Sequence, residues 1–179
     1  MTTFTSTQDG DWNDDATWGL SDGDYPGNGH TDGTDRAIIN HTVENNGNHH
    51  VGSITINAGK TLHGGGGAII YVHGDSNATS YENNGSVTNT PRVEFKNTGA
   101  DKNAKFGTGT YGIVEVNCSG RTVTMTSALT SSSNLTISAG TLNTSGSNYA
   151  ITTTGELNMT GGGNLTCNSS AVSVRNLYQ

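Results

Sequence analysis

Short apolar doublets recur along the second half of the chain at a spacing of about 21 to 22 residues. They begin three successive passes, at Val114/Val116, Leu135/Ile137 and Leu157/Met159. Further apolar positions follow within each pass, at Leu142 and Ile151 in the middle one. Inside a doublet the apolar residues alternate with polar ones, which is typical of a strand with one buried face. Each pass therefore predicts three short strands joined by tight turns.

A pass of this length cannot bury its own apolar residues, so successive passes must stack on one another. We therefore expect an all-β fold, a three-faced, right-handed parallel β-helix (solenoid) of about six coils. An internal echo supports the repetition, because Ile54-Thr-Ile-Asn-Ala-Gly-Lys-Thr-Leu62 returns as Leu135-Thr-Ile-Ser-Ala-Gly-Thr-Leu142. The first clear coil begins at Arg36.

The same pattern divides the chain into an N-terminal cap with the first strands, residues 1–50, and a solenoid, residues 51–179. Around residues 74–92 and 97–110 the apolar alternation loosens, so we expect longer loops there. A solenoid end exposes unpaired strand edges and an open core. Trp12, Trp18 and Tyr25, which lie among many aspartates, are expected to close that end.

Composition favours a folded β-protein over a disordered one. Only 30% of the residues are hydrophobic, but the polar residues are mainly Thr, Asn, Ser and Gly, interrupted by β-branched residues at alternating positions. The net charge of −7, with only eight Lys and Arg, argues against nucleic-acid binding. No stretch approaches the ~20 apolar residues of a membrane span. Met1 to Asp11 lack the features of a signal peptide.

Residues 9–62 resemble the opening of the glycine-rich β-helix domain, named for its eight glycines, of cell-surface and hyaluronan-processing proteins. The matching residues are Asp11-Trp12, Asp15-Ala-Thr-Trp18-Gly19, Pro26-Gly27, Asp35-Arg-Ala-Ile38-Ile39-Asn-His-Thr-Val43 and Ser53-Ile54-Thr-Ile56-Asn-Ala-Gly59-Lys-Thr-Leu62. Parallel β-helix proteins of phage tails and surfaces have similar openings. The resemblance implies a β-helix entered through a tryptophan-containing cap, and it implies no catalytic residues.

Two residue types are candidates for metal binding. Asp9, Asp11 and Asp14 are weak calcium candidates. Asp9 and Asp11 have the spacing of the first ligands of a calcium-binding loop, but the required Gly is missing and Leu20 stands where the final Glu is needed. We expect no cofactor, with an irregular Ca²⁺ site as the alternative. The six histidines show no spacing that places two ligands on one face of a strand, so we interpret them as surface residues.

One pair of carboxylates is compatible with catalysis. Glu94 and Glu115 lie 21 residues apart and so on the same face of successive coils, where Lys96 or Arg92 could assist them. Cleavage of a glycoside needs two carboxylates ~5 to 9.5 Å apart, and adjacent strands lie about 4.8 Å apart. The competing interpretation is a charged, outward-facing pair beside a loop.

Three tyrosines, Tyr71, Tyr81 and Tyr111, are candidates for stacking on sugars, together with Tyr149, although their alignment along one face does not follow from the sequence.

We expect a non-enzymatic structural or adhesive protein of a virion, a phage capsid decoration or a tail-fibre or spike component. The repetition, the nearly uncharged surface after Arg121 and the lack of an export signal lead to this interpretation. By analogy with other β-helical virion proteins, a homotrimer bound to other virion proteins is expected. The alternative is a carbohydrate-binding or carbohydrate-cleaving domain of a larger secreted surface protein, with cell-surface glycans as partners.

Overall fold

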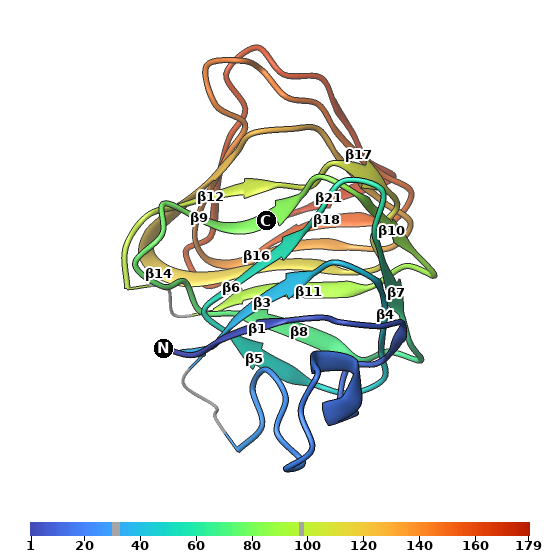
Figure 1. The fold of residues 1–179 in the computed structure, drawn as a ribbon. Helices are drawn as coiled ribbons and strands as arrows, with labels where there is room; N and C mark the ends of the chain where they lie inside the picture. Colours follow the sequence, from blue (N-terminus) through green and yellow to red (C-terminus); the bar gives the residue numbers. More distant parts are fainter. Residues whose placement is uncertain (30–32, 97–98) are drawn as a thin grey trace.

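The protein is a parallel β-solenoid of about six turns, as the repeat predicts. The structure is a computed structural model that describes residues 1–29, 33–96 and 99–179. Each full turn contributes one strand to each of three faces, and the pairs between described strands are parallel. In Figure 1, the short helix η1 (Asp15–Trp18) projects at the lower end, and the turns of the last coils project at the upper end.

The strands of the three faces follow one another in every coil. Face one comprises β5 (His49–Val51), β8 (Ile69–Val72), β11 (Arg92–Lys96), the first parts of β14 (Val114–Met125) and β16 (Leu135–Asn143), β18 (Glu156–Met159) and β21 (Asn176–Tyr178). Face two comprises β1 (Thr3–Thr5), β3 (Arg36–Ile39), β6 (Ser53–Ile56), β9 (Thr79–Asn83), β12 (Lys102–Lys105), the later parts of β14 and β16, and β19 (Asn164–Thr166). Face three comprises β2 (Gly10–Asp11), β4 (Thr42–Asn45), β7 (Thr61–Gly64), β10 (Ser86–Thr88) and β13 (Thr108–Gly109), then β15 (Leu129–Ser131), β17 (Ile151–Thr153) and β20 (Val172–Ser173).

The register of the ladder matches the apolar columns of the sequence. On face one, Val93 pairs with Val114, Val114 with Leu135, and Leu135 with Leu157. All four side chains are buried, because alternate residues of a strand point to the same side. Burial of this column in successive coils is what joins the coils into one core, since no single coil could bury its apolar side chains alone.

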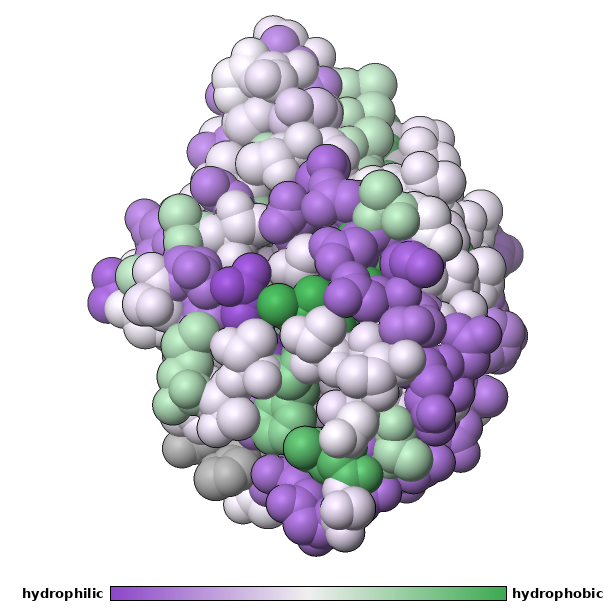
Figure 2. Space-filling model, viewed as in Figure 1, coloured by the Kyte–Doolittle hydropathy of each residue, from purple (hydrophilic) through white to green (hydrophobic). Residues whose placement is uncertain are grey.

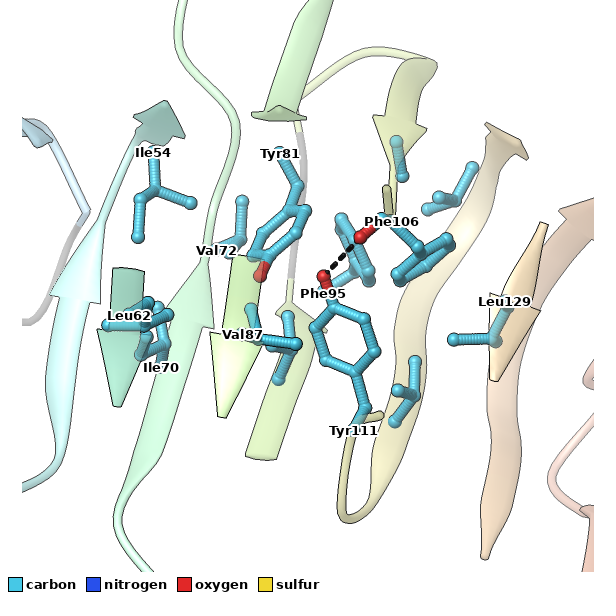
Figure 3. Close-up of a cluster of buried hydrophobic side chains, with 14 of the residues drawn as sticks. Ile54, Leu62, Ile70, Val72, Tyr81, Val87, Phe95, Phe106, Tyr111 and Leu129 are labelled. Atoms are coloured by element: carbon cyan, nitrogen blue, oxygen red, sulfur yellow. Dashed lines mark hydrogen bonds between the residues drawn. The ribbon is translucent and has the colours of Figure 1, made fainter. Parts of the chain in front are cut away.

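Aromatic side chains fill the middle of the solenoid (Figure 3). Tyr81, Phe95, Phe106 and Tyr111 are fully buried and contact one another with ring centroids 5.4 to 6.3 Å apart. The Tyr111 hydroxyl donates a hydrogen bond of 2.7 Å to the carbonyl oxygen of Phe106. Asn83, which is also buried, donates to that carbonyl at 2.7 Å and to the carbonyl of Thr108 at 3.0 Å. These side-chain bonds satisfy backbone carbonyls at a turn inside the core.

The expected long loops are largely part of the ladder. The segment 74–92 contains β9 and β10, and the segment 97–110 contains β12 and β13. Asn97 and Thr98 lie outside the described residues. The prediction was wrong here because polar residues occupy inward positions: Asn83 and Lys102 are at most 5% exposed. Lys102 donates through its ammonium group to the carbonyl oxygens of Asp75 and Asn77. Alternate side chains of these strands therefore still point into the core, but some of them are polar and do not appear as a hydrophobic pattern in the sequence.

The N-terminal segment closes one end of the core, and the ladder reaches into it. Trp12 and Trp18 are buried with ring centroids 5.3 Å apart. Each indole N–H has a partner, the Pro26 carbonyl at 2.9 Å and the Trp12 carbonyl at 2.7 Å. Tyr25 packs edge-on against His49. Because β1 pairs with β3, the parallel stack starts before Arg36, where the sequence places the first coil.

The opposite end is less tightly packed. Leu165, Val172 and Val174 are only partly buried against the core, and Leu177 and Tyr178 are exposed. The surface near the upper end of Figure 2 is mostly pale, which agrees with the Thr, Ser and Gly of these coils. Between Arg121 and the end of the chain the only charged side chains are those of Glu156 and Arg175.

Candidate functional site

The outward side of face one carries a column of chemically versatile side chains. His50 pairs with Tyr71, Tyr71 with Glu94, Glu94 with Glu115, and Glu115 with Thr136. These five residues, called the outward column below, alternate with the buried residues of the same strands and are all partly exposed. Their side chains lie side by side because the strands stack in register.

The sequence-predicted pair of carboxylates is brought together. Glu94 and Glu115 are direct partners on β11 and β14, and the spacing of adjacent strands is about 4.8 Å. The Asn117 amide donates to Glu94 at 3.2 Å, and the Ser138 hydroxyl donates to Glu115 at 2.7 Å. Partial burial raises the pKa of Glu94, and the neighbouring Glu115 carboxylate raises it further. The two carboxyl groups therefore differ in their hydrogen-bond partners, an amide for Glu94 and a hydroxyl for Glu115.

Tyr71 is held between neighbours on both sides. Its ring stacks on His50 of β5, with centroids 4.4 Å apart and planes 19° apart. The Lys96 ammonium of β11 lies 4.8 Å from the ring centroid. Because β8 lies between β5 and β11, these partners approach opposite faces of the ring. Both faces of the Tyr71 ring are therefore covered, so the ring is not available for stacking on a sugar, and Tyr71 presents only its edge and its hydroxyl.

The other tyrosine candidates are corrected by the structure. Tyr81 and Tyr111 are fully buried in the aromatic core, so neither can contact a glycan. Burial raises the pKa of the Tyr81 hydroxyl well above its ordinary value. Tyr149 packs, partly buried, against the same core. Sequence reasoning missed this because a tyrosine at an inward strand position fits a wide solenoid as well as a phenylalanine does.

A histidine pair that the sequence analysis did not find lies beside the outward column. His50 Nδ1 is 2.8 Å from His73 Nε2, and the ring centroids are 5.1 Å apart. The residues are 23 positions apart, one coil and two residues, so they meet only through the ladder. A search for ligands within one strand cannot detect such a pair. The signal was present in the register, which also led to Glu94 and Glu115.

The candidate calcium ligands Asp9 and Asp14 make hydrogen bonds within the N-terminal segment. Asp9 accepts a hydrogen bond from the Thr42 amide at 2.7 Å, and Asp14 caps η1 by accepting from the Ala16 amide at 3.1 Å. Asp11 lies on β2 beside Glu44. Among the described residues no three His, Cys, Asp or Glu side chains group closely enough to hold a metal ion.

No family model matches this sequence, and comparison with curated proteins and with solved structures finds no match. The resemblance of residues 9–62 to the glycine-rich domain therefore rests on the quoted residues alone. Within the described part of the chain, no helix is long and apolar enough to cross a membrane.

Proposed function

We propose that the protein is a non-enzymatic structural or adhesive component of a virion, used as a capsid decoration or in a tail fibre or spike. The observation that supports this most is the continuous buried column through successive coils, from Val93 to Leu157 on face one. Stacked coils with close-packed interiors resist bending and local opening. A rigid element of this kind suits a particle that must hold its shape outside a cell.

The surface chemistry supports the same function. Outward positions of the later coils carry hydroxyls and amides, such as Thr122, Thr136 and Asn158, which stay hydrated without charge. The chain has a net charge of −7 and few basic residues, so a nucleic-acid partner would not find clustered Lys and Arg. The partners that fit this proposal are other virion proteins, and cell-surface glycans for an adhesive component.

The proposal is tested by mass in solution and by location. We expect light scattering after size exclusion to give a homotrimer, three times the 18.5 kDa of one chain. Mass spectrometry of virus particles purified from the source culture should detect the chain in fixed proportion to the major capsid protein. A strict monomer that is missing from purified particles would contradict the proposal.

A second candidate function is binding or cleavage of a carbohydrate, as part of a secreted or cell-surface protein. The observation that favours it is the Glu94–Glu115 pair, with one carboxyl group of raised pKa and one that accepts from Ser138. Partners on adjacent strands, about 4.8 Å apart, can supply a general acid, Glu94, that protonates the leaving oxygen and a nucleophile, Glu115, that attacks the sugar carbon. Lys96 beside Glu94 would add a positive charge near the substrate.

Substitution of the two glutamates distinguishes a chain that cleaves a carbohydrate from one that only binds it or does not contact it. If the chain cleaves a polysaccharide in a reducing-sugar assay, Glu94→Gln and Glu115→Gln should each abolish the activity. Glu82→Gln is the matched control, because Glu82 lies on face two beside Lys105. A glycan array and a reducing-sugar assay that are both silent with the unsubstituted chain would reject this second function.

A further inference from the structure

The geometry points to a metal site on face one that is independent of the carboxylate pair: His50 and His73 together bind one divalent transition-metal ion such as Zn²⁺ or Ni²⁺. Two ring nitrogens, His50 Nδ1 and His73 Nε2, face each other at 2.8 Å. In the metal-free pair one of these nitrogens carries a proton and the other accepts it. When this proton moves to the other nitrogen of its ring, the lone pairs of His50 Nδ1 and His73 Nε2 point into the same small volume.

The two rings are held in place before any metal arrives. His50 stacks on Tyr71, which Lys96 contacts from its other side. His73 follows β8 and is only 9% exposed. Its ring lies against Gly33, where a Cβ would come within 2.4 Å of it. A glycine with φ of +65° thus leaves the space that the imidazole occupies. Little rotamer freedom remains to be lost on binding.

The distance between His50 Nδ1 and His73 Nε2 is close to the distance between two nitrogens that share a metal ion. Zn–N bonds of about 2.0–2.1 Å at a tetrahedral angle separate two nitrogens by about 3.3 Å. The pair needs to open by only about half an ångström to accept the ion. Binding requires only that the proton of the donor ring move to the other nitrogen of that ring.

The ligand type selects the class of metal. Imidazole nitrogens favour Zn²⁺, Ni²⁺ and Cu²⁺, whereas Ca²⁺ and Mg²⁺ require oxygen ligands. In the described part of the chain no group of three or more His, Cys, Asp or Glu side chains gathers here, so the two imidazoles are the ligands that this part supplies.

Calorimetry with the full chain, free of any affinity tag, tests the site. Titration of ZnCl₂ or NiCl₂ should show saturable binding of one ion per chain, and CaCl₂ should show none. His50→Phe keeps a ring against Tyr71 but removes the nitrogen, so affinity should fall by roughly tenfold or more, as loss of a ligand exceeds loss of an outer-shell partner. His63→Phe, which changes a histidine bonded to Thr88 on another face, should bind as the unsubstituted chain does.

A thermal melt of each variant without metal confirms that it is folded, so that a loss of binding cannot come from unfolding. A second readout is the ¹⁵N chemical shift of the two imidazoles, which should move together on addition of Zn²⁺ while that of His63 stays. Absence of saturable Zn²⁺ and Ni²⁺ binding, or equal affinity in His50→Phe, would overturn the inference.

Discussion

At the scale of single residues, the core depends on a few buried polar side chains. Asn83 is 1% exposed and donates to two carbonyls, those of Phe106 and Thr108. Asn83→Ala leaves the Thr108 carbonyl without this donor and opens a small void. We expect the free energy of unfolding to fall by about 2–3 kcal/mol, measured by urea denaturation.

The exposed neighbour is the control for this substitution. Asn84→Ala removes an amide at the surface of the same turn, so the change should stay within about 0.5 kcal/mol. Equal effects of the two substitutions would show that the buried hydrogen bonds of Asn83 do not stabilise the fold.

The buried side chain of His49, which packs on the cap residue Trp12, makes the stability of the fold depend on pH. His49 stacks on Trp12 at 5.0 Å, and burial, with a smaller effect of His50, lowers the pKa of His49 from 6.5 to about 4. Between these values the unfolded chain binds more protons than the folded one. Stability is therefore present above pH 6.5 and is lost as the pH falls toward 4, by roughly 3 kcal/mol for this residue. Urea denaturation at a series of pH values measures the loss.

His49→Phe should flatten that dependence, because the phenyl ring keeps the stack on Trp12 and binds no proton. His63→Phe, outside the cap, should retain the pH dependence of the unsubstituted chain. If His49→Phe loses stability with acid as steeply as the unsubstituted chain, another group controls acid unfolding.

At the scale of elements, the turns stack as closely as the strands do. Gly85 joins β9 to β10, and a Cβ there would lie 2.2 Å from the Lys60 carbonyl oxygen and 2.5 Å from that of Asn57. Gly85→Ala must push two turns apart, so we expect a loss of about 1–3 kcal/mol. Thermal or urea unfolding measures it.

Gly146 provides the comparison, because a Cβ there would meet nothing within 4 Å. Gly146→Ala should be neutral or slightly stabilising, since it restricts the unfolded chain. A similar loss for both glycine substitutions would mean that chain flexibility, and not the contact between turns, sets the cost.

The elements also show where sequence reasoning worked and where it failed. Strands with inward Val, Ile and Leu, such as β14 and β16, were predicted with their register because burial requires the alternation. Strands β9 and β12 were taken for loops, since inward Asn83 and Lys102 give no apolar signal. The Asn83 amide and the Lys102 ammonium group donate to turn carbonyls of other coils, contacts that a single-strand pattern cannot reveal.

The candidate site was predictable to the extent that it follows from the register. Glu94 and Glu115 were paired by their spacing, and the ladder confirms them as neighbours. To predict the His50–His73 contact, one would also need the diagonal offset between the two strands and the orientations of both rings. Tyr81 and Tyr111 were misplaced on the surface, because the width of the core, which decides whether a ring fits inside, is a property of the assembled solenoid.

At the scale of the whole molecule, a solenoid should tolerate loss of one complete coil. Deleting residues 135–156 joins Asn134 to Leu157, the position that pairs with Leu135. The shortened chain should still fold, with a β-type circular dichroism spectrum and cooperative unfolding at lower stability. Deletion of residues 135–145, half a coil, should abolish cooperative unfolding because it destroys the register. If the half-coil deletion folds as well as the full one, the coils do not stack in register.

The central claim is that residues one coil apart are neighbours, and methyl NOE spectroscopy of the labelled protein measures this directly. The structure predicts cross-peaks between Val93 and Val114, Val114 and Leu135, and Leu135 and Leu157, with none between Val93 and Leu157. Absence of the successive cross-peaks from a folded sample, or contacts between other positions of these strands, would contradict the parallel solenoid and every site derived from its register.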